Sequence, residues 1–208
     1  MSLDRLDGLY VITDDKLSPS STIISQVTQA LEGGARVVQL RDKKSSLEEI
    51  KEKALTLEVL CKEYDATFVL NDKVELAIEL GLSGLHIGKS DYFRVDEIRK
   101  NFKGCLGVSC YGDISFAKKM EEKGVDYVAF GSFFISPTKP DSNIVKPDIL
   151  SDAKSKLTIP VCAIGGLNTD NIHDVMQHKP DMISLINEIW TSEDIKSKAS
   201  YFASLYKV

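Results

Sequence analysis

Residues 37–43 read VVQLRDK, an apolar run that ends abruptly in charged side chains. Seven further short runs of apolar and β-branched residues recur along the chain, a composition typical of strands. They are LYVIT (9–13), TFVL (67–70), GLHIG (84–88), CLGVSC (105–110), YVAFG (127–131), IPVCAIGG (159–166) and MISLI (182–186). Together with residues 37–40, they predict eight strands.

Amphipathic stretches separate these runs, for example residues 21–34, 46–64 and 114–124. Their apolar positions recur at three and four residues, the spacing of a helix that lies on a sheet. The strand runs are continuously apolar, which indicates burial on both faces and hence a parallel sheet covered by helices. Eight such units average about 26 residues each, near the lower size limit of a (β/α)8 barrel.

We therefore predict a single (β/α)8 TIM barrel domain over residues 1–208. A doubly wound open sheet uses the same alternation of strands and helices, but no GxGxxG motif follows the first strand. The longest connection without clear periodicity is residues 133–147, which we interpret as a lid over the active face.

Composition narrows the class of partner. The net charge is -5 and no clustered basic surface is evident, which argues against nucleic-acid binding. No segment has the apolar length that spans a bilayer, and residues 1–20 lack a basic start followed by an apolar stretch. The four cysteines show no zinc spacing and are expected to be structural. These features predict a cytoplasmic protein that acts on small molecules.

In barrel enzymes the chemistry lies at the C-terminal ends of the strands. There the sequence places three cations, Arg41, Lys43 and Lys139, and two carboxylates, Asp72 and Asp91. Mg²⁺ is usually held by one or two carboxylates together with phosphate oxygens, so this set indicates a pyrophosphate substrate with magnesium. At each position a simpler interpretation competes: the aspartates could cap helices, and the cations could belong to a solvated loop.

Two further positions allow two interpretations each. Gly165 and Gly166 follow the seventh strand, where barrels frequently bind phosphate through backbone N–H groups, although a tight turn would also require glycine. His86 lies within an apolar strand and is expected to be a hydrogen-bonded interior residue rather than a metal ligand.

With these motifs assembled, the chain resembles the thiamine-phosphate synthase family. The similarity runs nearly end to end through GLYVITD, GGARVVQLRDK, VLNDKVELA, GLHIGKSD, GVS, DYVAFGSFF with SPTKP, and IPVCAIGGL. It implies a (β/α)8 barrel that joins 4-amino-2-methyl-5-hydroxymethylpyrimidine pyrophosphate to a thiazole phosphate. The products would be thiamine phosphate and pyrophosphate.

The resemblance also implies a role for each matching position. The pyrimidine pyrophosphate would be held by Gln39, Leu40, Arg41, Asp42, Lys43 and Asn71, with Ser109 facing the pyrimidine and Lys139 on the pyrophosphate. Mg²⁺ would be bound by Asp72 and Asp91. The thiazole phosphate would be held by Ser136, Pro137, Thr138, Gly166, Ile186 and Asn187. Those expected to act in the chemical step are Arg41, Lys43, Ser109 and Lys139.

The implied reaction begins with ionisation of the pyrimidine pyrophosphate to a carbocation, which the thiazole nitrogen then traps. The protein must stabilise a departing anion, which magnesium and fixed cations do. The chain departs from the family pattern at Ser136 for Thr, at Lys89 for Gln, and at Asn187 and Glu188 for Ser-Ala. A carboxylate at Glu188 would repel a phosphate unless it points away.

Three alternatives remain open. The related thiazole tautomerase relies on a His shortly after the fifth strand, where this chain has Tyr111. A non-catalytic protein that binds a thiamine precursor would bind ligands without releasing pyrophosphate. Another phosphosugar isomerase barrel would explain Gly165 and Gly166 but leave Asp72, Asp91 and Lys139 without a role. A homo-oligomer is compatible with the sequence, which does not specify the assembly.

Overall fold

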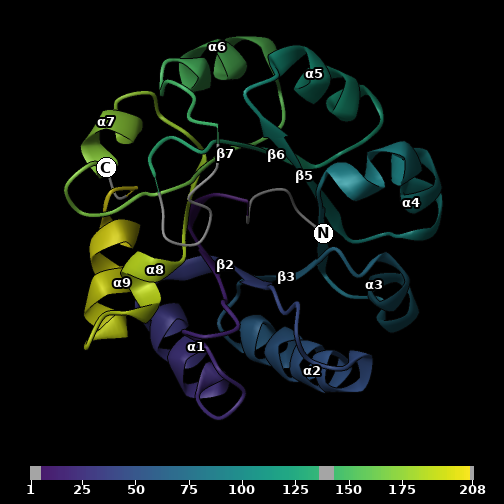
Figure 1. Ribbon diagram of the computed structural model, residues 1–208, viewed down its shortest axis with the longest axis vertical. Helices are drawn as coiled ribbons and strands as arrows, with labels where there is room; N and C mark the ends of the chain where they lie inside the picture. The colour runs from purple at the N-terminus through teal and green to yellow at the C-terminus, as the bar shows by residue number, and fades with distance from the viewer. Residues whose placement is uncertain (1–5, 136–142, 207–208) are drawn as a thin grey trace.

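The computed structural model describes residues 6–135 and 143–206. Eight parallel strands close into a barrel in the order β1-β2-β3-β4-β5-β6-β7-β8, and Figure 1 shows the helices forming a ring around it. The strands are β1 Gly8–Ile12, β2 Ala35–Leu40, β3 Thr67–Asn71, β4 Gly84–Ile87, β5 Cys105–Tyr111, β6 Tyr127–Phe130, β7 Val161–Ile164 and β8 Met182–Leu185. The predicted (β/α)8 barrel is thereby confirmed. The pairing of β1 with β8 excludes the open sheet, which has two unpaired edges.

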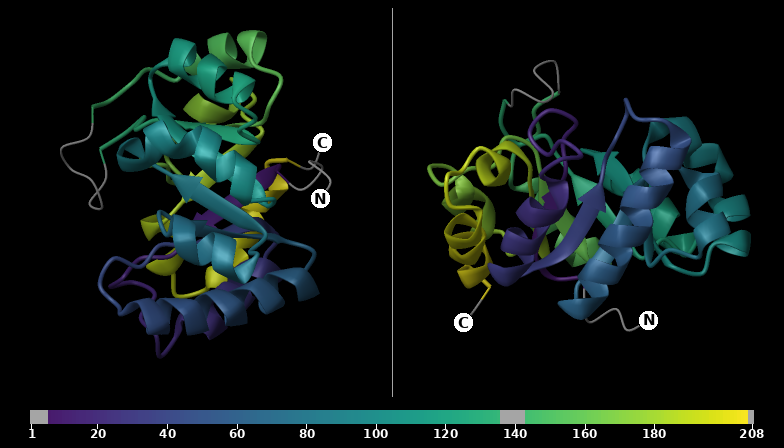
Figure 2. Two further views of the ribbon diagram at one scale, coloured as in Figure 1. Left: turned by 90° about the vertical axis from the view of Figure 1, so that its right-hand side faces the viewer. Right: turned by 90° about the horizontal axis from the view of Figure 1, so that it is seen from below.

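The helices cover the outside of the barrel, as the turned views of Figure 2 also show. The three helices predicted within residues 21–34, 46–64 and 114–124 are all present. The helices are α1 Ile23–Glu32, α2 Leu47–Glu63, α3 Val74–Leu80, α4 Val95–Asn101, α5 Ile114–Glu122, α6 Ile149–Lys156, α7 Ile172–Met176, α8 Asn187–Trp190 and α9 Ile195–Ser204, with a 3₁₀ helix, η2, at Lys89–Arg94.

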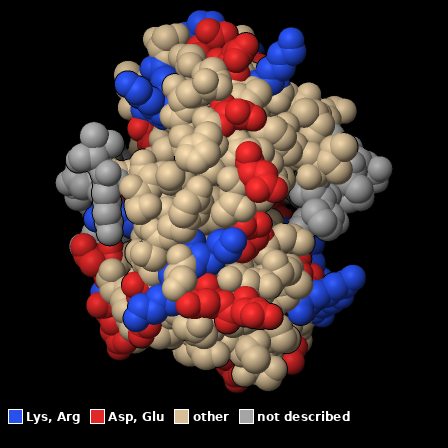
Figure 3. Space-filling view, turned by 90° about the vertical axis from the view of Figure 1, so that its left-hand side faces the viewer, with Lys and Arg blue, Asp and Glu red and all other residues tan. Residues whose placement is uncertain are grey.

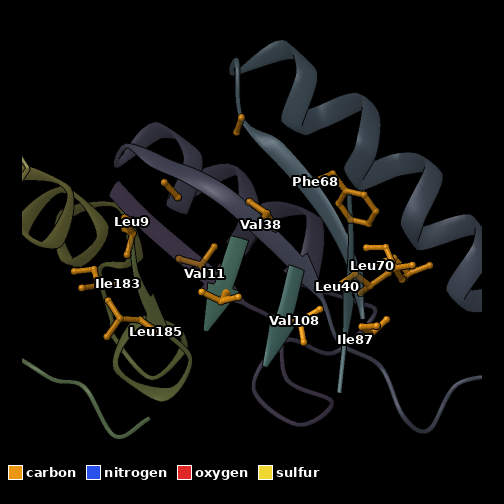
Figure 4. Packing of buried hydrophobic residues seen from close by; sticks show 14 of the residues in the cluster. Leu9, Val11, Val38, Leu40, Phe68, Leu70, Ile87, Val108, Ile183 and Leu185 are labelled. Carbon is orange, nitrogen blue, oxygen red and sulfur yellow. The ribbon is translucent and has the colours of Figure 1, made fainter. Parts of the chain in front are cut away.

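Two separate apolar clusters explain why the strands read as continuous apolar runs. The side chains of a strand alternate between its two faces. In β1, Leu9 and Val11 join the large cluster between sheet and helices, which Figure 4 shows from close by, whereas Tyr10 and Ile12 join a smaller cluster inside the barrel. All five residues of β1 are buried. Burial on both faces, inferred from the sequence, is thus present.

The connection from β6 to α6 begins at the C-terminal end of the barrel, where β6 ends at Phe130. Its described ends are fixed by backbone hydrogen bonds from Phe134 N to Gly165 O (3.0 Å) and from Val145 N to Ser132 O (2.9 Å). The middle of the predicted lid, residues 136–142, lies outside the described residues, and with it the predicted contacts of Ser136, Pro137, Thr138 and Lys139.

The surface and the cysteines agree with the composition. On the face drawn in Figure 3, basic and acidic side chains are interspersed and do not form one basic patch. In the part of the chain that the structure describes, no helix combines the length and apolarity needed to cross a membrane. All four cysteines are free thiols, and Cys61, Cys110 and Cys162 are buried.

Candidate active site

A cavity of about 670 Å³ opens at the C-terminal ends of the strands, and residues at or just beyond the end of each strand line it. Seven of the predicted substrate-binding residues are among its lining: Gln39, Arg41, Asn71, Ser109, Gly166, Ile186 and Asn187. The lining also includes Tyr10, Ile12, His86, Lys89, Tyr111, Ala129, Ile135, Asn143, Val145, Cys162, Ile164, Gly165, Ser184 and Glu188. The fold therefore brings together side chains that are far apart in the sequence.

The QLRDK segment distributes its side chains in different directions. Gln39 and Arg41 line the cavity, whereas Leu40 is buried in the outer core between sheet and helices. The backbone of the segment is tied to the loop after β1, since Arg41 N donates to Thr13 Oγ1 and Lys43 N donates to Asp15 Oδ1, both at 3.0 Å. If Leu40 contacts the substrate, it would therefore do so through its backbone atoms.

Both carboxylate oxygens of Asp42 accept hydrogen bonds from groups of the protein itself. Its Oδ1 accepts from Lys44 N (3.0 Å) and Ser45 N (2.9 Å), and its Oδ2 accepts from Lys53 Nζ on α2 (2.7 Å). Burial raises the pKa of the Asp42 carboxyl, but the hydrogen bonds from Lys53 and Ser45 outweigh it and hold the pKa well below its usual range. The charged carboxylate therefore braces the loop that carries Arg41 and Lys43.

Both aspartates predicted to bind Mg²⁺ have an atom near Gly88. A Cβ on Gly88 would lie 4.0 Å from Asp72 Oδ1, and Asp91 N donates to Gly88 O at 3.1 Å. Neither aspartate caps a helix. The N-cap residues of α3 and α4 are Lys73 and Arg94, and the side chains of these two residues make no capping hydrogen bond. The simpler interpretation that competed for these residues is thus absent from the structure.

Asp91 and Lys89, which lie in the same 3₁₀ helix, contact different partners. Asp91 Oδ2 accepts from Ser90 Oγ (2.6 Å), and its Oδ1 lies 3.6 Å from Arg94 Nη1. Lys89 Nζ stands 4.4 Å from the centre of the Tyr111 ring. Burial, followed by the charge of Asp72, raises the pKa of the Tyr111 hydroxyl. Lys89, the departure from the family pattern noted in the sequence, therefore lies at the cavity wall.

The glycines after β7 are required by close packing. Gly166 has φ +68°, a conformation that side-chain-bearing residues rarely adopt, and a Cβ there would lie 2.5 Å from Phe134 O. A Cβ on Gly165 would lie 2.5 Å from Ser132 Cβ. The tight approach of the loop after β6 is enough to explain both glycines. Both also line the cavity, so the same bare backbone is open to a ligand.

Comparisons with known proteins agree with this geometry. The family model described as thiamine monophosphate synthase matches residues 9–189. A thiamine-phosphate synthase of Nitrosospira multiformis is 36% identical over 204 residues, covering 98% of this chain and 87% of the relative. One of Wolinella succinogenes is 39% identical over 191 residues, covering 90% of this chain and 87% of the relative.

A solved structure, thiamine phosphate pyrophosphorylase from Pyrococcus furiosus, is 32% identical and superposes with a TM-score of 0.87, covering 99% of this chain and 98% of that one. The chain belongs to the thiamine monophosphate synthase family. The enzymes of this family are transferases, so the chain is a transferase. The resemblance to the family that the sequence motifs indicated is confirmed.

One departure from the thiamine monophosphate synthase pattern is compensated in the structure. Glu188, which lines the cavity, receives a hydrogen bond from Lys198 Nζ on α9 at 2.9 Å. Thr169 Oγ1 lies 3.4 Å from the same carboxylate oxygen. The positive charge of Lys198 offsets the carboxylate, so this end of the cavity is less repulsive to an anion than the sequence alone suggested.

Sequence reasoning missed a set of polar side chains inside the barrel. Tyr10, Tyr127 and Ser184 are buried, and Ser184 Oγ has no hydrogen-bond partner among the described residues. His86 was expected to be a hydrogen-bonded interior residue, and this is confirmed by its bonds to Tyr127 (2.8 Å) and Ser109 (2.9 Å). The available signal was strand alternation, which places these residues on the same face of their strands as the cavity-lining positions.

Proposed function

We propose that this protein is a thiamine-phosphate synthase, which condenses 4-amino-2-methyl-5-hydroxymethylpyrimidine pyrophosphate with thiazole phosphate to give thiamine phosphate and pyrophosphate. The observation that carries the proposal is the cavity itself. It joins Gln39, Arg41 and Ser109, assigned to the pyrimidine pyrophosphate, to Gly166 and Asn187, assigned to the thiazole phosphate. Family membership supports the same activity.

Cations at the mouth support pyrophosphate as the leaving group. Arg41 and Lys89 line the cavity, and Lys43 is exposed in the loop beside Arg41. Within residues 6–135 and 143–206, no acidic side chain forms an ion pair with any of the three. Their charge is thus available to a polyanion. Lys139, which lies outside the described residues, would add a fourth cation from the lid that we propose over residues 133–147.

Magnesium fits the residues present. No cluster of three or more acidic, His or Cys side chains exists in the described part of the chain. Mg²⁺ needs no such cluster, because one or two carboxylates suffice when substrate phosphates and water complete the octahedron. Asp72, whose Oδ1 lies near the space left by the missing side chain of Gly88, and Asp91, whose backbone N–H donates to Gly88 O, would hold it. When bound, the ion would neutralise part of the pyrophosphate charge.

The proposed reaction requires no general base. The C–O bond of the pyrimidine pyrophosphate breaks and its electron pair leaves with the pyrophosphate, which Arg41 and Lys43 stabilise. The exocyclic amino group of the pyrimidine shares the positive charge that remains on the carbon. The thiazole nitrogen then donates its lone pair to that carbon and forms the new C–N bond. Ser109 would orient the pyrimidine ring during both steps.

The deciding experiment measures pyrophosphate release by purified protein with both substrates and Mg²⁺. We expect release to require both substrates and metal, and to fall at least about 100-fold in Asp72→Ala and Asp91→Ala variants, since each removes a charge that positions the leaving group. Asp96→Ala is a matched control, because this exposed aspartate on α4 pairs only with Lys123 among the described residues. Binding of either substrate without release would favour a non-catalytic binding protein and refute the proposal.

The tautomerase alternative is weaker on structural grounds. It needs a histidine shortly after β5, where this chain has Tyr111, 40% exposed and with φ 55°. His86, the one histidine that lines the cavity in the described residues, already bonds Tyr127 and Ser109 through its two ring nitrogens.

We further propose that the protein acts as a single-domain enzyme of the cytoplasm. Its four free cysteines support a reducing compartment, because thiols persist unpaired there.

A further inference from the structure

Lys89 lines the cavity from the segment that follows β4. It is the first residue of η2, directly after Gly88, and its side chain is exposed. A Cβ on Gly88 would lie 4.0 Å from Asp72 Oδ1, and Asp91 stands two residues after Lys89. The segment that carries Lys89 therefore passes close to one carboxylate proposed to bind Mg²⁺ and carries the other.

The ring of Tyr111 favours one position of the Lys89 ammonium group. Lys89 Nζ lies 4.4 Å from the centre of this ring, within the range of a cation–π interaction. The backbone of Tyr111 is fixed at the end of β5, where its carbonyl accepts a hydrogen bond from Gly131 N at 3.0 Å. Both Lys89 and Tyr111 line the cavity. A lysine side chain held in this way loses less conformational entropy when it binds an anion.

No ion pair neutralises Lys89 within residues 6–135 and 143–206. Asp91 of η2 and Glu75 of α3 both pair with Arg94 instead, at 3.6 and 2.6 Å. Burial and then the charge of Asp72 raise the pKa of the Tyr111 hydroxyl, so this carboxylate also lies near the ring that Lys89 contacts. The charge of Lys89 is therefore available to an anion that arrives beside these carboxylates.

A lysine at this position acts on the same anion as a metal ion held by the two aspartates. Two cations beside one anion repel each other, so each contributes less to binding when the other is present. The family pattern has an uncharged glutamine where this chain has Lys89. The substitution therefore adds a fixed positive charge that is present whether or not metal is bound.

We propose that Lys89, positioned by Tyr111, binds the pyrophosphate group beside the metal ion and lowers the dependence of pyrophosphate binding on Mg²⁺. The inference rests on the proposed function and deepens it, because it adds a binding residue at a position that the family pattern leaves uncharged. Tyr111 acts only through Lys89 and is a positioning residue. Asp72 and Asp91 would still hold the ion, so turnover keeps its requirement for metal.

The test measures binding of inorganic pyrophosphate to the wild type and to Lys89→Gln by calorimetry, once in a chelator and once in saturating Mg²⁺. In the chelator, we expect the variant to bind about tenfold more weakly, because a charged hydrogen bond is lost. In Mg²⁺, the loss should shrink to about threefold, because the ion neutralises part of the same charge. Metal bound to free pyrophosphate affects both proteins equally and cancels in the ratio.

Variants of Tyr111 test the positioning role. Tyr111→Leu removes the ring face and should weaken pyrophosphate binding in the chelator about threefold, whereas Tyr111→Phe keeps the face and should bind like the wild type. In a protein that already carries Lys89→Gln, Tyr111→Leu should cause no further loss. An equal loss in the two backgrounds would refute the positioning role, because the ring would then act independently of the lysine.

Lys103→Gln is the matched control for net charge. Lys103 is exposed, its Nζ donates to Lys100 O at 2.8 Å, and it precedes β5, at the end of the barrel opposite the cavity. Its substitution removes the same charge and should leave pyrophosphate binding unchanged in both buffers. A loss equal to that of Lys89→Gln would mean that overall charge, and not the place of Lys89, determines binding.

The remaining outcomes also decide the inference. Failure of the wild type to bind pyrophosphate in the chelator would overturn it, as would an equal loss in Lys89→Gln with and without Mg²⁺. Thiamine phosphate formation by a wild type whose pyrophosphate binding does not change in Lys89→Gln would refute this inference alone. The expected binding pattern in a protein that forms no thiamine phosphate would refute the synthase assignment and leave the role of Lys89 established.

Discussion

Lys53 Nζ lies 2.7 Å from Asp42 Oδ2, linking α2 to the loop that carries Arg41 and Lys43. The side chains of this pair are 13% and 10% exposed. The pair thus lies where charge-assisted hydrogen bonds are strong, and it fixes the backbone between the two cations assigned to the pyrophosphate.

Asp42→Asn should lower the free energy of unfolding at pH 7 by about 2 kcal/mol, because it removes charged hydrogen bonds but keeps the shape of the side chain. The pKa of Asp42 is depressed in the folded state, below its unfolded value of about 3.9. Its contribution is therefore complete above that value and is lost as the pH falls through the folded pKa. Urea unfolding should show a smaller difference at pH 3 than at pH 7.

Asp7→Asn provides the control for that measurement. Asp7 pairs with Arg36 at 3.0 Å, but the two side chains are 50% and 51% exposed, so its loss should cost less than about 1 kcal/mol. Equal effects of the two substitutions, or an Asp42→Asn effect that is the same at both pH values, would contradict the assigned role of the pair.

Lys198→Met should weaken binding of thiazole phosphate. It removes the cation that offsets Glu188 at the cavity wall and leaves an unneutralised carboxylate there. A repulsion of about 1 kcal/mol raises KM for this substrate about fivefold, with KM for the pyrimidine pyrophosphate unchanged. Initial rates at varied thiazole phosphate measure it. Lys196→Met, which breaks the pair with Glu32 on the outer helices, should leave both KM values as they are.

The strands and the strand-end residues could be predicted from sequence because they depend on local pattern. A continuous apolar run followed by polar residues determines both the parallel strand and the end of the barrel at which Arg41 or Asn71 lies. What the sequence could not show are pairings between distant residues. The Asp42–Lys53 pair, the Glu188–Lys198 pair and the bond between Tyr10 and Tyr127, 117 residues apart, depend on which side chains the closed barrel brings face to face.

The role of Gly166 also could not be decided from the sequence, because it depends on which distant segment packs against it. The sequence left a phosphate site and a tight turn as alternatives for Gly166, and the close approach of the loop after β6 satisfies the second without excluding the first. For Asp72 and Asp91 the structure does remove one of the two interpretations, because neither residue caps a helix.

The cysteine thiols should be unreactive in the native protein. Burial raises the pKa of the Cys61 thiol to about 12, and burial also raises the pKa of Cys105, Cys110 and Cys162. Because the thiolate is the reactive form, a disulfide reagent at pH 8 should react at least about 100-fold more slowly with native protein than with protein unfolded in urea. A fast-reacting native thiol would show that one of these sites opens to solvent.

Gly166→Ala should destabilise the protein by about 3 kcal/mol, as it combines a strained positive φ with a Cβ placed 2.5 Å from Phe134 O. Gly81→Ala isolates the first of these effects. Gly81 has φ +59° with nothing within 4 Å of an added Cβ, so its substitution should cost only about 1 kcal/mol and leave activity unchanged. Urea unfolding and steady-state rates on both variants separate the two costs. Because relief of the Gly166 contact requires the loop after β6 to move away from the cavity, KM for thiazole phosphate should rise in that variant alone. Equal stability losses in the two proteins would mean that this loop yields freely and that close packing is not what requires glycine at position 166.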